Sequence, residues 1–458
     1  MNYEEFLMTK AALAPVRGMA HVPELHQAMK PHQRDTVEFL LRVGCGAAFL
    51  DTGLGKTLVS LEWSRVVSEH TARPVLMLAP LAVARQHERE AKKFGIEGTR
   101  VVREQSEIGQ GINIANYEML HRFDRNAFGG IVLDESSIIK NYTGKTTRAL
   151  MDFAAPIPFR LCASATPAPN DHMELGQHCQ FLGVMDSNEM LARWFISDQT
   201  EMGRYRLKKY AVDSFWSWVA SWSRCVSKPS DLGHDDSGFV LPELLTHQHI
   251  VKADITTDTG GMLFRIPDTS ATQIHKEKRI TASLRAEKIA EIVIGDPNEP
   301  WIIWCETDYE ADAMRAAYPA AIEVRGSMSA DEKERRLIAF SECGGVLLTK
   351  PSIAGYGLNW QHCARVAFVG LSFSYEQYDQ AIRRCWRFGQ QRPVHVHVAM
   401  ADTEEAILRT VMRKAGEHED MKRHMFGAMA RATETRGVKL NYNPTETARL
   451  PSWIRSVA

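Results

Sequence analysis

The sequence has few of the features that mark secreted, membrane-bound or strongly basic proteins. Lys and Arg total 55 and Asp and Glu total 56, so the formal net charge is −1, and bulk charge does not indicate nucleic-acid or membrane binding. The eight cysteines include no C-x-x-C pair and no local Cys/His cluster at zinc-ligand spacing, which favours free thiols in a reducing compartment. No stretch approaches the ~20 apolar residues that cross a bilayer, and the first residues lack a signal-peptide pattern. We therefore expect a cytoplasmic protein that does not bind membranes.

Buried-strand patterns occur in two separate parts of the chain. At about 150 residues per domain, a chain of 458 residues is expected to form two large domains or three ordinary ones. Short apolar runs that end in small or polar residues are typical of buried parallel strands. Such runs lie at residues 75–80, 111–117, 130–135 and 159–167, and again at 301–305, 345–352, 365–370 and 394–401. The pattern predicts two α/β domains, each with a parallel sheet.

The segments outside these runs set the predicted domain boundaries. Residues 184–237 are rich in Trp and basic residues, lack a buried-strand pattern and lead into a polar stretch, which indicates a mostly helical insertion followed by a linker. Residues 402–433 have helical periodicity with mixed charge. The predicted division is an N-terminal nucleotide-binding domain (1–183), the insertion and linker (184–275), a C-terminal domain (276–432) and a tail (433–458).

A glycine loop between a predicted strand and a predicted helix is the strongest local motif. It reads LDTGLGKT over residues 50–57. Gly53 and Gly55 would let backbone N–H groups face phosphate oxygens, Lys56 would reach the β and γ phosphates, and Thr57 would hold Mg²⁺. Leu50 stands where the strict phosphate-loop pattern has glycine. The alternative is a glycine-rich turn with an exposed lysine.

Two carboxylates, Asp134 and Glu135, follow the predicted strand at 130–135. After a phosphate loop, such a pair can divide the work of nucleotide hydrolysis, with Asp134 binding Mg²⁺ and Glu135 deprotonating the attacking water. The alternative is a solvated acidic turn.

Arg384 and Arg387 lie three residues apart in the second predicted domain and share one face of the segment if it is helical. A guanidinium can bind two oxygens of a γ-phosphoryl group. These arginines would complete a catalytic site when the domains close, and a basic surface helix is the alternative.

The predicted insertion carries a local excess of positive charge. Its basic residues include Arg204, Arg206, Lys208 and Lys209, which can bind nucleic-acid phosphates without sequence preference. Trp218 and Trp222 are four residues apart, the spacing of a buried helical stripe. We expect these rings to pack in a core, although stacking on bases is an alternative.

With these motifs in this order, the chain resembles superfamily two helicases, and within them the Swi/Snf-like DNA translocases. The resemblance covers residues 25–408 and also includes MKPHQRDTVEFLL (29–41), APLAVARQHEREAKKF (79–94), NYEML (116–120), SATP (164–167), KPSIAGYGLNWQ (350–361) and QAIRRCWRFGQ (380–390). DESSIIKN and KPSIAGYGLNWQHC are similar to DEAD/DEAH-type helicases encoded by phages and prophages. The resemblance implies two tandem RecA-like domains with ATP and Mg²⁺ in the cleft between them.

The resemblance also assigns roles residue by residue. It implies that Gln33 contacts adenine, that Gly357 and Gln380 belong to the ATP site, and that Ser164 and Thr166 couple ATP hydrolysis to movement. DNA contacts would fall at Pro80, Asn116, Lys350, Ser352 and Asn359.

Some positions depart from the family pattern. His87 stands where Trp is usual, and Ser136 and Ser137 replace the last two positions of the D-E-x-H form, so the link between this motif and SATP is open. The predicted function is ATP hydrolysis coupled to movement along double-stranded DNA, in a bacterial or phage-infected cytoplasm. The alternatives are a strand-separating DNA or RNA helicase and a nucleotide-gated clamp, and the sequence identifies no protein partner.

Overall fold

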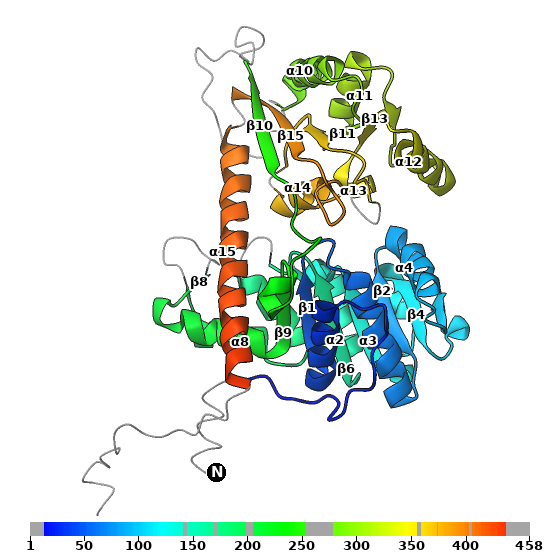
Figure 1. The fold of residues 1–458 in the computed structure, drawn as a ribbon, viewed down its shortest axis with the longest axis vertical. Helices are drawn as coiled ribbons and strands as arrows, with labels where there is room; N and C mark the ends of the chain where they lie inside the picture. The colour runs from blue at the N-terminus through cyan, green and yellow to red at the C-terminus, as the bar shows by residue number, and fades with distance from the viewer. Residues whose placement is uncertain are drawn as a thin grey trace, which may run out of the picture.

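Two lobes, each built on a parallel β-sheet, are stacked along the long axis of the molecule (Figure 1). The computed structural model describes residues 13–140, 144–168, 172–197, 205–252, 278–354, 359–372, 374–402 and 405–436. None of the described helices is long and apolar enough to cross a membrane. The predicted fold class, two α/β domains with a parallel sheet each, is confirmed.

The sheet of the first lobe has seven strands in the order β3-β4-β2-β5-β6-β1-β9, all paired in parallel. The strands are β1 (Cys45–Leu50), β2 (Val75–Ala79), β3 (Thr99–Val101), β4 (Ile112–Asn116), β5 (Gly130–Asp134), β6 (Phe159–Ser164) and β9 (Ser223–Val226). The helices are α2 (Pro31–Val43), α3 (Lys56–Thr71), α4 (Leu81–Lys93), α5 (Lys145–Ala154), α6 (Leu175–Phe181), α7 (Ser187–Trp194) and α8 (Val212–Trp222). Apolar side chains of α2, α3 and α4 pack on one face of the sheet, and those of α5 to α8 on the other.

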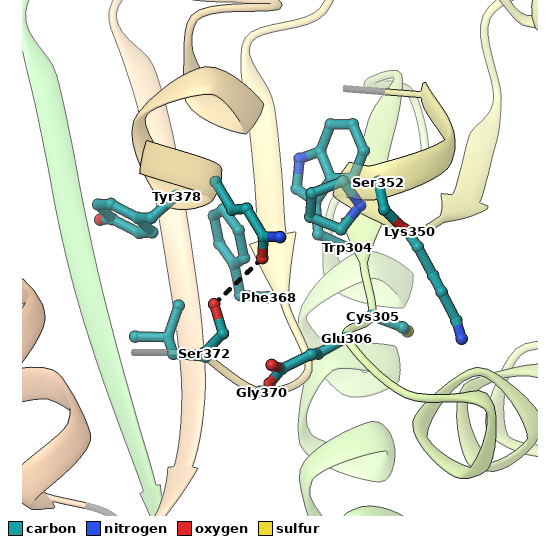
Figure 2. Close-up of a pocket in the computed structure, with 12 residues that line it drawn as sticks. Trp304, Cys305, Glu306, Lys350, Ser352, Phe368, Gly370, Ser372 and Tyr378 are labelled. Carbon is teal, nitrogen blue, oxygen red and sulfur yellow. Dashed lines mark hydrogen bonds between the residues drawn. The ribbon is translucent and has the colours of Figure 1, made fainter. Parts of the chain in front are cut away.

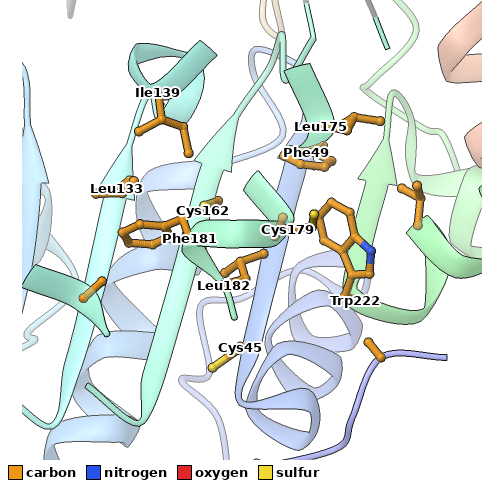
Figure 3. Close-up of a cluster of buried hydrophobic side chains, with 14 of the residues drawn as sticks. Cys45, Phe49, Leu133, Ile139, Cys162, Leu175, Cys179, Phe181, Leu182 and Trp222 are labelled. Carbon is orange, nitrogen blue, oxygen red and sulfur yellow. The ribbon is translucent and has the colours of Figure 1, made fainter. Parts of the chain in front are cut away.

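Figure 3 shows how the second of these faces is covered. Leu175, Cys179 and Phe181 of α6 pack over β1, β5 and β6, and Trp222 of α8 lies beside Phe49 of β1. The indole of Trp218 is also buried and stacks on Trp194, with 4.6 Å between ring centroids. The expectation that these tryptophans pack in a core is confirmed, because the insertion completes the core of the first lobe.

The sheet of the second lobe has six strands in the order β10-β15-β14-β11-β13-β12, again all parallel. They are β10 (Leu244–Val251), β11 (Trp301–Trp304), β12 (Ile322–Glu323), β13 (Val346–Thr349), β14 (Arg365–Phe368) and β15 (Val394–Ala401). The helices are α10 (Ala282–Gly295), α11 (Asp308–Ala317), α12 (Ala330–Cys343), α13 (Pro351–Ala354), α14 (Tyr375–Ile382) and α15 (Glu405–Arg436). Apolar residues of α10 and α11 pack on one face, and those of α12, α14 and the start of α15 on the other.

Helix α15 joins the two lobes. Its 32 residues rise by about 48 Å at 1.5 Å per residue, and the orange helix in Figure 1 runs beside β10 and β15 and then beside α8. Ile407, Leu408 and Val411 belong to the core of the second lobe, whereas Met421 and Met425 belong to that of the first. The helix therefore spans the interface instead of ending in the second lobe.

The structure corrects the predicted domain boundaries. Strand β9 lies within the segment predicted to be an insertion and linker, yet it extends the first sheet by pairing with β1. Strand β10, in the same segment, extends the second sheet by pairing with β15. Helix α15 continues to Arg436, past the predicted end at 432, and its second half packs on the first lobe. Residues 1–12 and 437–458 lie outside the described residues.

Candidate active site

The glycine loop has the geometry of a phosphate-binding loop. It connects the buried strand β1 to α3, whose first residue is Lys56 and whose N-cap is Gly55. Gly53 and Gly55 have φ values of 98° and 80°, a left-handed conformation that side chains other than glycine disfavour. A Cβ on Gly53 would lie 2.7 Å from the Cβ of Phe388. The loop therefore requires glycine here, and it leaves the N–H groups at the start of α3 free of intrahelical partners.

Lys56 lies among carboxylates at the start of α3. Burial lowers the pKa of Lys56, while the negative charges of Glu135, Asp134 and Asp51 act to raise it. The predicted phosphate ligand and the predicted carboxylate pair thus converge on one site, although they are separated in sequence by strands β2 to β5. The carboxyl end of a parallel sheet is where α/β proteins bind nucleotides.

Asp134 is fixed by two groups from neighbouring elements. The Nε2 atom of His87, on α4, lies 2.8 Å from Oδ2 of Asp134, and the Tyr117 hydroxyl donates a hydrogen bond of 2.6 Å to the Asp134 carbonyl. Burial opposes ionisation of the carboxyl, but His87 and Lys56 outweigh it and hold the pKa of Asp134 below its usual range. His87, which departs from the family pattern, therefore positions an ionised carboxylate.

Glu135 is held in a conformation suited to a catalytic base. Its φ is 59°, which costs a residue other than glycine on the order of 1–3 kcal/mol and is often found at functional sites. The Ser164 hydroxyl donates a hydrogen bond of 2.8 Å to Oε1 of Glu135. Burial and the charge of Asp134 raise the pKa of Glu135, against the effect of Lys56. A carboxylate with a raised pKa accepts a proton from water more readily.

The DESS segment at 134–137, which lacks the histidine of D-E-x-H, contacts the SATP segment directly. Ser164 contacts Glu135 as described, and its Oγ also accepts a hydrogen bond of 3.1 Å from the backbone N–H of Thr166. The hydroxyl of Thr166 is buried and has no hydrogen-bond partner among the described residues. The hydroxyl of Ser136, at the x position of D-E-x-H, lies 3.1 Å from Nε2 of His178 on α6. The coupling roles of Ser164 and Thr166 stay predictions. The hydrogen bond between Ser164 and Glu135, through which they would act, is present.

The segment after α14 brings the second lobe onto the glycine loop. Phe388 packs against Gly53, and the Arg383 guanidinium lies 3.7 Å from Asp51. Arg383 also forms an ion pair of 2.7 Å with Asp379. Sequence reasoning missed Arg383, because its neighbour Arg384 fits the family spacing. The only available signal was a third basic residue in the same short segment.

The predicted catalytic arginines and Gln380 lie on or directly after α14. Arg387 donates a hydrogen bond to Oδ1 of Asn359, and burial lowers its pKa to about 10, so the guanidinium remains charged at neutral pH. The Nε atom of Arg387 and the Nε2 atom of Gln380 are buried without a hydrogen-bond partner among the described residues. Asn359 is exposed and accepts this hydrogen bond through Oδ1 only, so its predicted DNA contact stays a prediction. The ATP roles of Arg384, Arg387 and Gln380 stay predictions.

Glu376 of α14 makes a second contact between the lobes. It accepts a hydrogen bond of 2.7 Å from the Ser137 hydroxyl and forms an ion pair with Lys140. Ser137 stands where D-E-x-H has histidine. Neither Glu376 nor Lys140 was identified from the sequence, since a glutamate on a helix has no motif of its own.

Gln33 lies against the glycine loop. Its Nε2 atom donates a hydrogen bond of 2.9 Å to the Leu54 carbonyl, and its Oε1 accepts one of 2.9 Å from the Lys30 N–H. Both polar ends thus have partners within the protein, so the structure assigns Gln33 a role in holding the loop. Its predicted contact with adenine is untested.

The predicted DNA contacts lie along the strand ends of both lobes. Pro80 is the N-cap of α4, and Asn116 ends β4. Ala79, the last residue of β2, lies opposite Asn116 in the parallel register of β2 and β4. In the second lobe, Lys350 and Ser352 line a cavity at the carboxyl ends of β11, β13 and β14 (Figure 2). The Lys350 ammonium forms an ion pair of 2.8 Å with Asp308, an exposed carboxylate at the start of α11. Gly357, predicted for the ATP site, lies outside the described residues.

The predicted basic patch is smaller than the sequence suggested. Arg206 and Lys209 are exposed near the hairpin of β7 (Phe195–Ser197) and β8 (Tyr205–Leu207). Lys208 is not available to bind phosphate, because its ammonium donates hydrogen bonds of 2.9 and 3.0 Å to the carbonyls of Ala192 and Arg193 at the end of α7. Arg204 lies outside the described residues.

These side chains fit ATP and Mg²⁺. The glycine loop and Lys56 offer N–H groups and a cation to phosphate oxygens, and Asp134 keeps an oxygen other than the one that contacts His87. Thr57, in the first turn of α3, offers a hydroxyl, and oxygen atoms are the ligands that Mg²⁺ prefers. When bound, Mg²⁺ would neutralise charge on the phosphates. Glu135 would then orient and deprotonate water.

The fold and site define a two-lobed, RecA-like nucleotide-binding protein with a phosphate loop in the first lobe. Residues 32–212 match the family described as SNF2-related domain, and residues 285–389 match the one described as helicase conserved C-terminal domain. Together these matches support the Swi/Snf-like helicase superfamily.

Similar proteins include several named for DNA repair. The DNA repair and recombination protein RAD54B of Mus musculus is 30% identical over 206 residues, which cover 38% of this chain and 23% of the relative. The DNA repair and recombination protein RAD54-like of Drosophila grimshawi is 22% identical over 517 residues, covering 88% of this chain and 65% of the relative. The SNF2 domain-containing protein ENL1 of Oryza sativa subsp. japonica is 26% identical and is covered over 55% of its length. The chain thus spans less than two thirds of each of these relatives.

Among solved structures, the chain is similar to the Sulfolobus solfataricus SWI2/SNF2 ATPase core in complex with dsDNA. The TM-score is 0.42 and the identity 19%, with 91% of this chain and 98% of the other covered.

Proposed function

We propose that this protein is an ATP-dependent DNA translocase that hydrolyses ATP at the interface of its two lobes. The observation that supports the proposal most directly is the contact of both lobes with one glycine loop. Lys56, Asp134 and Glu135 come from the first lobe, and Arg383 and Phe388 reach the same loop from the second. A site divided in this way links each cycle of nucleotide binding and hydrolysis to closing and opening of the lobes.

Nucleic acid as the partner is supported by the strand ends of both lobes and by the relatives. Pro80 and Asn116 in the first lobe and Lys350 and Ser352 in the second lie at the carboxyl ends of their sheets. Alternating grips on the phosphate backbone at these two places would move the protein along DNA without reading its sequence. The names of the relatives associate them with DNA repair and recombination. We favour double-stranded DNA.

The test compares ATP hydrolysis by the full chain with duplex DNA, single-stranded DNA or RNA as the stimulant. We expect duplex DNA to stimulate most, and we expect the protein to displace the third strand of a triplex, which reports translocation without strand separation. Lys56→Ala is the control for hydrolysis by a contaminating enzyme. Hydrolysis that no nucleic acid stimulates would favour a nucleotide-gated clamp, and unwinding of a duplex would favour a strand-separating helicase.

We also propose a phage or prophage origin and a cytoplasmic location. The origin is supported by the sequences DESSIIKN and KPSIAGYGLNWQHC, and the location by eight cysteines that are all free thiols.

A further inference from the structure

Four histidines form a ladder on the outer strands of the second sheet. His247 and His249 lie on the edge strand β10, and His395 and His397 on β15. Residues two apart on a strand face the same side, and the parallel register places His247 opposite His397. The rings stack, with centroids 4.7 Å apart for His247 and His397, and 5.2 Å apart both for His247 and His395 and for His249 and His397.

The ring nitrogens of the ladder are close enough to share one ion. His247 Nε2 lies 3.0 Å from His395 Nδ1, and His249 Nε2 lies 3.0 Å from His397 Nδ1. One ring nitrogen from each of His247, His395 and His397 falls within 4.8 Å of the others. Two imidazole nitrogens bound to one tetrahedral ion at ~2.0–2.1 Å lie about 3.3 Å apart. The nitrogens of His247 and His395 are thus already near the separation that a shared ion requires, and the third ligand nitrogen lies within 4.8 Å.

We propose that His247, His395 and His397 bind a divalent transition-metal ion of the zinc class. Neutral imidazole is a preferred ligand of Zn²⁺, Cu²⁺ and Ni²⁺, and three histidines are a sufficient protein ligand set for zinc. His249 is a positioning residue, because its contact with His397 fixes the orientation of that ring, as outer-shell partners of metal ligands commonly do. This site is separate from the nucleotide site and does not depend on the proposed function.

The surroundings of the ladder suit a cation. The four rings are half-buried, and Lys288 and Arg365, the cations near them, are each paired with a carboxylate, Glu291 and Asp296, at 2.9 Å.

A bound ion would strengthen the attachment of the edge strand β10 to its sheet. Strand β10 carries the chain from the first lobe into the second and forms the edge of its sheet. Among the described strands, β10 pairs only with β15. Ligands from both strands would add a cross-link between them, so the ion would stabilise the connection between the lobes.

The test is a Zn²⁺ titration of the full chain, prepared without a histidine tag and freed of metal, in competition with a chromophoric chelator. We expect one tightly bound ion per chain, and we expect Co²⁺ to give the visible absorption bands of a histidine-ligated ion. His395→Gln and His247→Gln should each weaken binding by at least about tenfold, and His249→Gln by roughly tenfold through the orientation of His397. The control is His21→Gln, which removes an exposed histidine of the first lobe and should leave binding unchanged.

Two results would overturn the proposal. One is a wild-type chain that binds no Zn²⁺ in competition with the chelator and gives no Co²⁺ absorption, which would leave the ladder as stacked, hydrogen-bonded histidines only. The other is unchanged affinity in the His247→Gln variant. That residue is on the edge strand, so its replacement should preserve the fold, and equal metal-free melting temperatures of variant and wild type verify this.

Discussion

Replacing Lys422 should destabilise the contact between the two lobes. This lysine of α15 is 4% exposed, and its ammonium lies 2.9 Å from Oδ1 and 3.0 Å from Oδ2 of Asp51, the second residue of the glycine loop. Burial opposes ionisation of Asp51, but Lys422 and Arg383 outweigh it and hold the pKa of Asp51 well below its usual range. Lys422→Met keeps the aliphatic stem and removes only the charge.

The size of the effect follows from the geometry. At a separation of about 3 Å and an effective dielectric constant of about 20, the attraction is roughly 5–6 kcal/mol, and part of it is offset by the desolvation of both ions. Removing one partner of a buried pair typically costs ~3–5 kcal/mol, because the other charge stays buried. Arg383, at 3.7 Å from Asp51, compensates part of that charge. We therefore expect Lys422→Met to lower the free energy of unfolding by about 3 kcal/mol. For a unit the size of the first lobe this is a fall of roughly 6–12 °C in melting temperature.

The assay is thermal and urea denaturation followed by circular dichroism. Arg423→Met is the matched control, since the neighbouring Arg423 has a side chain that is 78% exposed and should change stability by less than about 0.5 kcal/mol. The double variant Asp51→Asn with Lys422→Met should recover much of the loss, because no unpaired charge remains. A Lys422→Met chain as stable as the control would refute the argument that this pair joins the lobes.

The same pair predicts a pH dependence with a definite sign. The folded-state pKa of Asp51 is depressed, so its contribution to stability is present above the unfolded value of about 4 and is lost as the pH falls below it. The difference in stability between the wild type and Lys422→Met should therefore shrink on acidification below about pH 4. Three further experiments test the catalytic and DNA-binding assignments. Glu135→Gln should abolish ATP hydrolysis but preserve ATP binding, because it removes the base without removing Asp134. Fluorescent-nucleotide titration measures the binding, and a matching loss of ATP affinity would contradict the division of roles between Asp134 and Glu135. Arg387→Ala should lower ATP hydrolysis by ~10³-fold at saturating DNA. Arg387→Lys should restore little of the activity, since one ammonium lacks the planar pair of donors of a guanidinium. Parental turnover in both variants would exclude an ATP site shared by the two lobes. Arg206→Gln with Lys209→Gln should weaken DNA binding and reduce its salt dependence by about two phosphate contacts; an unchanged slope would mean that these side chains face away from DNA.

Much of the fold was predictable because the relevant patterns are local. The apolar runs at 75–80 and 130–135 match β2 and β5, since a strand buried on both faces is apolar along its length. The run at 394–401 matches β15, in which two half-buried histidines alternate with buried apolar residues. Strand β9 was missed because its sequence, SRCV, contains two polar residues. Its burial depends on β1 and on α15, which is contributed by a distant part of the chain.

The sequence by itself determined the glycine loop, the carboxylate pair and the tandem α/β plan, because each rests on residues that are adjacent in the chain. Only the tertiary structure decided which groups from distant segments meet them. His87 reaches Asp134, Glu376 reaches Ser137, and Lys422 reaches Asp51. The two H-x-H pairs of the histidine ladder are 148 residues apart, and strand pairing brings them together. Such contacts carry no local signal, because the strand order and the path of α15 fix them after the cores have formed.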